Sequence, residues 1–304
     1  MFAGMVIVLV AVLVRPDKSL EELKSTYTDS ESRFISLQEM NVHYRREGAG
    51  PLVVLLHGTS SSLHTWEGWT RILIDTFRVI RLDLPGFGLT GPHPNHNYSM
   101  EMYTAFLREF LDSLQTGPIH LAGNSLGGQI AWEYAVRFPD HVRSLILLDA
   151  AGYPQPEETP LVMQLAQSRI LSLFAQYLNP RFLVRKSLLE VYGNDALVTD
   201  SLVNRYTDLM LRKGNRKAFV QRVRQHGSPH QETIQEVSQP TLIMWGEQDE
   251  WIPVRDAYQF AENIPQARLR IYGGVGHLPM EEHPGRTGRD ARNFLLQVED
   301  NIQK

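Results

Sequence analysis

A series of short apolar runs, separated by segments with helical spacing, limits the fold of this chain more than any other feature. Each run is followed within two residues by glycine or aspartate, and the runs are residues 52–56, 79–82, 119–122, 145–148, 241–245 and 268–272. Continuously apolar strands are buried on both faces, and strands that alternate with helices form mostly parallel sheets. The sequence therefore predicts an α/β fold, with a mostly parallel sheet flanked by helices.

Two parts of the chain depart from this alternation. Residues 33–37 and 40–44 alternate around a turn, which predicts an antiparallel hairpin. Residues 153–237 contain helical patterns but no convincing central strand. We expect them to form a helical cap inserted into a core of residues 33–152 and 238–304, over the strand ends where ligands bind in open α/β sheets. A second helical domain without a role in catalysis is the alternative.

The N-terminus begins with an uncharged apolar run, residues 2–14, followed by Arg15. This length fits the apolar region of a signal peptide and falls short of the roughly 20 residues of a membrane span. No basic residue precedes the run and no small-x-small site follows it before Arg15, which argues against cleavage. A short anchor, a start site placed too far downstream and a buried element of the fold remain open. We expect a membrane-associated or exported protein with a polar linker up to residue 32, and a cytoplasmic location as the alternative.

Composition excludes several classes of protein and site. The 304 residues are 42% hydrophobic and carry a net charge of −4, without a basic cluster that would indicate nucleic-acid binding. Cysteine is absent, which excludes a thiolate nucleophile, a disulfide framework and a cysteine-based metal site. No histidine or carboxylate pattern has metal-ligand spacing, so we expect neither a metal nor a cofactor.

The motif Gly-Asn-Ser-Leu-Gly-Gly, residues 123–128, follows the apolar run 119–122 and precedes a helical segment. In this strand-turn-helix setting, Gly-x-Ser-x-Gly is typical of a nucleophile elbow, which presents the serine at the tip of a sharp turn. Gly123 and Gly127 leave room for the turn, and Ser125 becomes the exposed hydroxyl. A glycine-rich turn without chemistry is the alternative, since the motif alone is common.

Two further loops supply the partners that a serine nucleophile needs. Asp249 follows the run 241–245, and His277 follows the run 268–272. Parallel strands end at the same edge of a sheet, so these side chains can converge with Ser125 there. A hydroxyl is a weak nucleophile at neutral pH and requires a base that is itself oriented by a third group.

In these features the chain resembles the α/β-hydrolase superfamily, in its serine esterase and lipase-like branch, from about residue 33 to the C-terminus. The order serine, aspartate, histidine is the order of that superfamily. The resemblance implies an eight-stranded sheet with an inserted cap. It also implies Ser125 as nucleophile, His277 as general base and then acid, and Asp249 as the orienting carboxylate. Asp149, which also ends a strand, is the rival acid.

The resemblance also suggests an oxyanion hole and a substrate pocket. The backbone N–H of Leu126 follows the nucleophile, and the N–H of Thr59 follows His57-Gly58, with Ser60 as a substitute if that loop is shifted. For His57 itself we expect a hydrogen bond that fixes the loop. Pocket candidates are Trp66, Phe87 and Tyr153.

The favoured function is hydrolysis of small or medium apolar carboxylic esters through an acyl-serine intermediate. Ser125 at the elbow argues against dehalogenases and epoxide hydrolases, which use an aspartate nucleophile. Carbon–carbon bond hydrolases of aromatic degradation share Gly-Asn-Ser-x-Gly-Gly, but the tryptophan that usually follows their catalytic histidine is replaced here by Leu278. Cofactor-free haloperoxidases and a ligand-binding module without turnover are further alternatives.

Overall fold

The computed structural model describes residues 15–154, 160–168, 177, 179–225, 230–302 and 304. Its centre is an eight-stranded sheet with the order β1-β2-β4-β3-β5-β6-β7-β8. The strands are β1 Ser32–Leu37, β2 Met40–Glu47, β3 Leu52–Leu56, β4 Arg78–Leu82, β5 Ile119–Asn124, β6 Val142–Leu148, β7 Thr241–Gly246 and β8 Ala267–Tyr272. From β4 to β8 the neighbours are parallel, and β2 is antiparallel to both β1 and β4. The predicted hairpin and mostly parallel sheet are therefore confirmed.

Both faces of the sheet are buried, as the continuous apolar runs predict. In β3, Val54 and Leu56 belong to one hydrophobic core, whereas Val53 and Leu55 belong to the other. Successive side chains of a strand point to opposite faces, so a strand between two cores must be apolar throughout.

Helices cover the two faces. The first core contains residues of α4 (Met100–Ser113), α5 (Leu126–Arg137) and α11 (Arg255–Asn263). The second contains residues of α3 (Glu67–Leu73), which follows the short helix η1 (Leu63–Trp66), and of α13 (Pro284–Ile302). Ser99 begins α4 as a side-chain cap that accepts the N–H of Met102.

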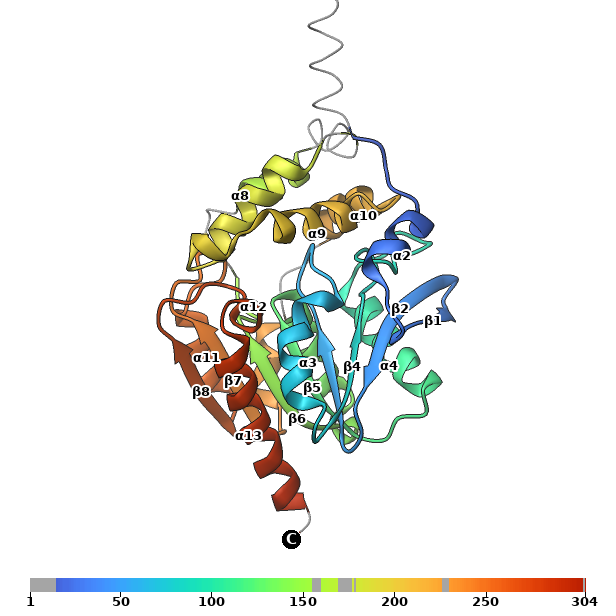
Figure 1. Cartoon of the computed structure of the whole chain (residues 1–304). Helices are drawn as coiled ribbons and strands as arrows, with labels where there is room; N and C mark the ends of the chain where they lie inside the picture. The colour runs from blue at the N-terminus through green and yellow to red at the C-terminus, as the bar shows by residue number, and fades with distance from the viewer. Residues whose placement is uncertain (1–14, 155–159, 169–176, 178, 226–229, 303) are drawn as a thin grey trace, which may run out of the picture.

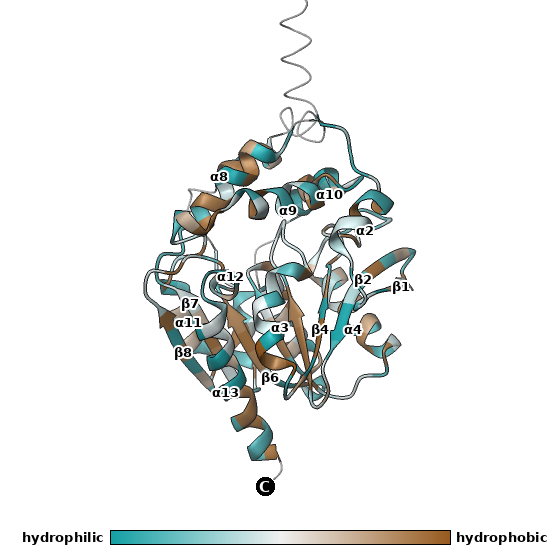
Figure 2. Cartoon of the chain, in the orientation of Figure 1, coloured by the Kyte–Doolittle hydropathy of each residue, from teal (hydrophilic) through white to brown (hydrophobic). Residues whose placement is uncertain are grey.

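Between β6 and β7 the chain leaves the sheet and forms a layer of helices. They are α6 (Leu161–Gln167), α8 (Arg181–Val191), α9 (Asp200–Met210) and α10 (Asn215–Arg224). Figure 1 shows α8, α9 and α10 lying across the top of the sheet, and Figure 2 shows apolar residues on α8. This layer covers one end of the sheet, and we refer to it as the cap.

The N-terminal helix α2 (Leu20–Tyr27) lies beside the cap. Within the described ranges, no helix is long and apolar enough to cross a membrane. The apolar run at residues 2–14 lies outside the described residues.

Candidate active site

Ser125 sits at the turn between β5 and α5, with a backbone conformation that is rare for a residue with a side chain. Its φ is 54° and its ψ is −117°. Such strain persists only where the surroundings impose it. A Cβ on Gly123 would lie 2.1 Å from the carbonyl oxygen of Gly127, and one on Gly127 would lie 2.3 Å from that of Leu56. Both glycines are therefore required by close packing of the backbone around Ser125.

The side chains of Asp249 and His277 contact each other near the elbow. The Nδ1 atom of His277 lies 2.6 Å from Oδ2 of Asp249, and both side chains are buried. The other oxygen, Oδ1, accepts the backbone N–H groups of Trp251 and Ile252 at 2.8 and 3.0 Å. These three bonds fix the carboxylate, which in turn holds the imidazole so that Nε2 is free to act.

Ser125 and His277 line the same cavity. The side chain of Asn124, next to the nucleophile, donates to the main-chain oxygens of His277 at 3.0 Å and of Leu148 at 3.2 Å. Asn124 thus ties the elbow to the histidine loop. The sequence motif includes this asparagine, but its sequence position alone predicted no role for it.

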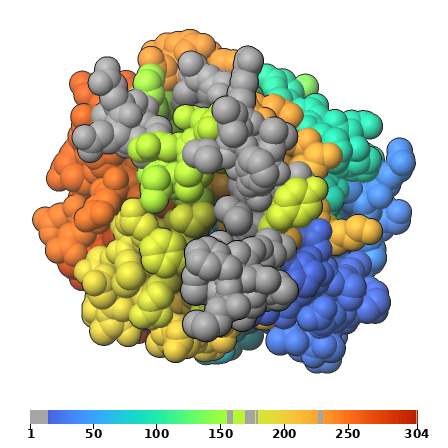
Figure 3. Space-filling model, turned by 90° about the horizontal axis from the view of Figure 1, so that it is seen from above, coloured from blue at the N-terminus to red at the C-terminus, as the bar shows by residue number. Residues whose placement is uncertain are grey.

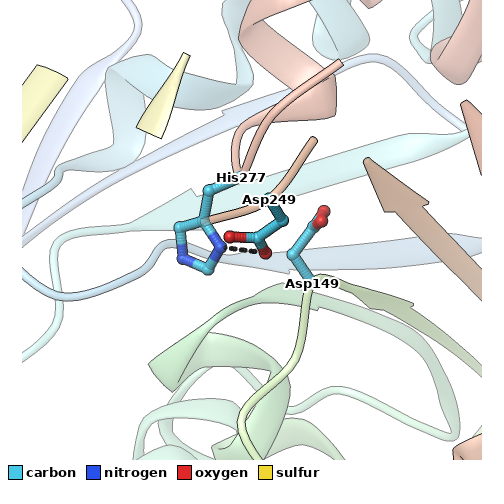
Figure 4. A group of neighbouring side chains, drawn as sticks. All are labelled: Asp149, Asp249 and His277. Carbon is cyan, nitrogen blue, oxygen red and sulfur yellow. Dashed lines mark hydrogen bonds and ion pairs between the residues drawn. The ribbon is translucent and has the colours of Figure 1, made fainter. Parts of the chain in front are cut away.

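Asp149 lies next to the aspartate–histidine pair without bonding to the histidine. Single oxygen or nitrogen atoms of Asp149, Asp249 and His277 all lie within 4.8 Å of one another (Figure 4). Oδ1 of Asp149 accepts the N–H of Gly246 at 2.9 Å. Burial, followed by the charge of Asp249, raises the pKa of Asp149 well above its usual range. The raised pKa favours the protonated form of Asp149.

This trio is the cluster of potential metal ligands within the described part of the chain. A bound zinc ion would need its ligands at about 2.0–2.2 Å, on separate sides of the ion. The imidazole and Asp249 instead contact each other at 2.6 Å. The arrangement fits an aspartate–histidine pair better than a metal centre.

The loop after β3 approaches the elbow closely. His57 is buried there, with Nδ1 donating to the carbonyl oxygen of Gly58 at 2.7 Å and Nε2 accepting the N–H of Leu84 at 3.0 Å. Burial lowers the pKa of His57, so it stays neutral. It fixes the loop, as expected from sequence.

The two residues expected to supply oxyanion donors lie near Ser125. Thr59 lines the cavity that contains Ser125, and Leu126 is the first residue of α5. The first N–H groups of a helix have no partner within it. The backbone amide of Leu126 is therefore available to a ligand.

The cavity runs under the cap and has a volume of about 200 Å³. Its described lining is mostly apolar, and the cap contributes much of it: Val162, Leu165, Leu183, Leu188, Phe219 and Val220. Burial of a hydrocarbon chain there would be favoured by about 0.8 kcal/mol per CH₂ group.

The three aromatic residues predicted for the pocket do not line this cavity. Trp66 is fully buried and packs edge-on against Trp69. Phe87 packs against His57, and Tyr153 packs against Phe260. Phe87 does line a small pocket together with Ser60, Ser61 and Phe219, which also line the main cavity. That these aromatics contact a substrate stays a prediction.

Glu281 joins the cap to the core at the edge of the site. It accepts hydrogen bonds from Tyr192, Arg205 and Tyr206, on the cap side, at 2.8, 2.6 and 2.8 Å. It also accepts one from Thr65, in the core, at 2.6 Å. Burial by itself would raise the pKa of Glu281, but the charge of Arg205 and these hydrogen bonds hold the pKa below its usual value.

Comparison with known proteins assigns the family. The model of the alpha/beta hydrolase fold matches residues 51–284. The chain belongs to the α/β-hydrolase family. This α/β-hydrolase is 29% identical, over 87% of its length and 95% of the relative's, to the 2-hydroxy-6-oxononadienedioate/2-hydroxy-6-oxononatrienedioate hydrolase of Cupriavidus pinatubonensis.

Two solved structures are also similar to this α/β-hydrolase. The meta-cleavage product hydrolase of Pseudomonas fluorescens IP01 has a TM-score of 0.76 and 26% identity, covering 88% of this chain and 98% of the other. A bacterial membrane phospholipase A has a TM-score of 0.75 and 27% identity, covering 88% and 86%. A hydrolase is thus supported. The expected ester specificity is not confirmed, and the curated relatives favour the carbon–carbon bond alternative.

Proposed function

We propose that this α/β-hydrolase cleaves esters of apolar carboxylic acids through an acyl intermediate on Ser125. The observation that carries the proposal is the apolar cavity under the cap, which opens onto both Ser125 and His277. A cavity of this kind gains most from an uncharged hydrocarbon chain, because it offers few groups that could replace the water around a charge.

In the proposed reaction the Ser125 hydroxyl attacks the ester carbonyl while Nε2 of His277 takes its proton. Asp249, bonded to Nδ1, stabilises the imidazolium that forms. The backbone N–H groups of Leu126 and Thr59 stabilise the oxyanion, each by about 3–4 kcal/mol. His277 then protonates the departing alcohol, and water attacks the acyl-enzyme by the same route.

Hydrolysis of a carbon–carbon bond is the second candidate, because the curated relatives carry out that reaction by name. A nonadienedioate has two carboxylates at neutral pH, and their burial requires cationic partners. The described lining of the cavity contains a single arginine or lysine, Arg216, which is already paired with Asp17 at 2.7 Å. This lining favours the ester.

A substrate panel tests the two candidates against each other. The purified protein is assayed with p-nitrophenyl esters of increasing acyl length and with 2-hydroxy-6-oxo-6-phenylhexa-2,4-dienoate. We expect kcat/KM to rise with acyl length and to exceed that for the dienoate. The reverse order would make the carbon–carbon reaction the main activity. No turnover of either class would reject both.

The Ser125→Ala variant is the control for the nucleophile, and full retention of activity in it would reject the mechanism. Labelling by a fluorophosphonate separates a slow enzyme from a binding module. We expect stoichiometric labelling of wild-type protein and none of Ser125→Ala.

A further inference from the structure

The turn after β3, which carries the expected oxyanion donor Thr59, is strained. Ser60 has a φ of 62°, in the left-handed region that residues with a side chain seldom adopt. The N–H of Ser61 donates to the carbonyl oxygen of Gly58 at 3.3 Å. A Cβ on Gly58 would lie 3.1 Å from Cβ of Ser125, so the turn lies against the elbow. A strained turn keeps its shape only where its neighbours impose it.

Tyr206, on α9, contacts this turn from the cap. Figure 3 shows the molecule from above, with residues of the cap in yellow and light orange on this face. The hydroxyl oxygen of Tyr206 lies 3.3 Å from Oγ of Ser61, and the hydroxyl donates to Oε1 of Glu281 at 2.8 Å. A hydroxyl has a single proton to donate, so Ser61 donates to Tyr206. The hydrogen bonds therefore run in one direction, from the turn through the cap to the carboxylate.

Glu281, in α12 (Pro279–Glu282), is a firm acceptor for these bonds. Its lowered pKa keeps it ionised near neutral pH. Burial, followed by the charge of Glu281, raises the pKa of Tyr206, so the phenol keeps its proton. The same oxygen, Oε1, also accepts the hydroxyl of Thr65 at 2.6 Å. One carboxylate oxygen thus holds the loop at Thr65 directly and at Ser61 through Tyr206.

We propose that Tyr206 is a positioning residue for the oxyanion hole: by accepting the hydroxyl of Ser61, it holds the strained turn so that the N–H of Thr59 meets the oxyanion. The inference deepens the proposed ester hydrolysis and rests on it. Tyr206 lines the cavity, but its proton goes to Glu281 and not to a substrate oxygen. An oxyanion hole acts on the transition state, so loss of the Tyr206 hydroxyl should lower kcat and leave KM unchanged.

The kinetic test uses Tyr206→Phe and Ser61→Ala, which remove the two ends of one hydrogen bond, with p-nitrophenyl butyrate as substrate. We expect each variant to lower kcat about tenfold, less than the roughly 10²–10³-fold loss for an oxyanion donor removed outright. The double variant should lose no more than either single one, because both changes break the same bond. An unchanged kcat in folded Tyr206→Phe, a raised KM with kcat retained, or additive losses would overturn the proposal.

The matched control is Tyr192→Phe. Tyr192 also donates its hydroxyl to Glu281 at 2.8 Å, but to Oε2, and it is not among the described residues that line the cavity. We expect its kcat and KM to equal those of wild type. A fall in kcat equal to that of Tyr206→Phe would assign the effect to the contact between cap and core in general and overturn the proposal. Thermal unfolding of each variant shows that the assay temperature lies below its transition.

A binding measurement makes the inference independent of turnover. Butylboronic acid adds to a serine hydroxyl: Oγ of Ser125 bonds to boron, His277 takes the hydroxyl proton, and a boron-bound oxygen occupies the place of the oxyanion. We expect calorimetric titration to show this binding about tenfold weaker in Tyr206→Phe than in wild type, with binding of 1-octanol unchanged. If wild-type protein hydrolyses no ester, the proposed function fails while this result still decides the role of Tyr206. Equal binding of the boronic acid by both proteins, or none by wild type, would overturn the inference.

Discussion

At the scale of single residues, two buried acids, Asp149 and Asp249, lie beside His277. Sequence reasoning ranked Asp249 above Asp149 from the form of its loop, and the structure bonds Asp249 to His277. Asp149 is buried beside this pair, and its burial and the neighbouring carboxylate of Asp249 raise its pKa, which favours the protonated form. An amide has the shape of a protonated carboxyl group and the same ability to donate.

We therefore expect Asp149→Asn to fold and to be stabilised relative to wild type as the pH rises. An acid with a raised pKa in the folded state binds more protons there than in the unfolded state. The stability of the wild-type protein therefore falls as the pH rises above the ordinary value of 3.8 towards the raised one. Urea unfolding at pH 4, 6 and 8 measures the difference, which should grow with pH.

The control for this prediction is Glu250→Gln, which removes an exposed carboxylate from the same loop as Asp249. Its difference from wild type should stay constant across the same pH range. A constant difference for Asp149→Asn as well would contradict the assignment of the proton to Asp149.

At the scale of elements, the sequence predicted the features that depend on local spacing, such as the elbow. It did not predict those that depend on tertiary packing, such as the wall of the cavity. The elbow could be predicted because the motif lies within one short stretch of sequence, where Gly123 packs directly against Gly127. The cavity wall could not, because α6, α8 and α10 meet only after the cap has folded. Trp66 and Tyr153 are close in sequence to site residues, yet their rings pack into the core.

The elbow should not tolerate a side chain at Gly127. Gly127→Ala places a methyl group 2.3 Å from the carbonyl oxygen of Leu56, so β3 or α5 must shift. We expect a loss of about 1–3 kcal/mol in the free energy of unfolding and a large loss of kcat. Gly117→Ala is the matched control, since its methyl group meets no atom within 4 Å. Equal stabilities of the two variants would contradict the steric argument.

The contact of Glu281 with the cap predicts a second change in stability. Glu281→Gln removes the charge that faces Arg205 and should cost about 3 kcal/mol near neutral pH, because the guanidinium stays buried. A lowered pKa means that this contribution is present above the ordinary value of 4.5 and is lost as the pH falls through the folded-state pKa. Chemical denaturation at pH 7 and in acid measures both.

The exposed pair of Arg108 and Asp112 provides the comparison for Glu281. Asp112→Asn should cost less than about 1 kcal/mol, as surface ion pairs do. If Glu281→Gln cost no more than this, Glu281 would not join the cap to the core energetically.

At the scale of the whole molecule, the N-terminal segment packs against the cap and also follows the apolar run that is expected to determine where the protein is located. Residues 15–18 follow the apolar run directly and contact the cap. Aromatic side chains of the cap are exposed nearby, with Tyr177 at 58% and Phe182 at 74%. We propose that the apolar run brings the cap to a membrane, where exposed aromatics favour the interface.

Removing residues 2–14 should then shift the protein from the membrane fraction to the soluble fraction of cells without loss of esterase activity. Fractionation with and without these residues, followed by assays of both fractions, measures this. Phe182→Ser in the full chain should weaken membrane binding by a smaller amount. Recovery of the full chain from the soluble fraction alone would reject the membrane proposal.

The main-chain N–H of His277 donates to the carbonyl oxygen of Val191 at the end of α8, at 2.7 Å. The loop that carries His277 is therefore shaped in part by the cap. For protein engineering, this means that the cap is not an interchangeable module. A chimera that imports another cap to change specificity must reproduce the Val191 carbonyl and the partners of Glu281, or it will lose the geometry of the base along with the old substrate.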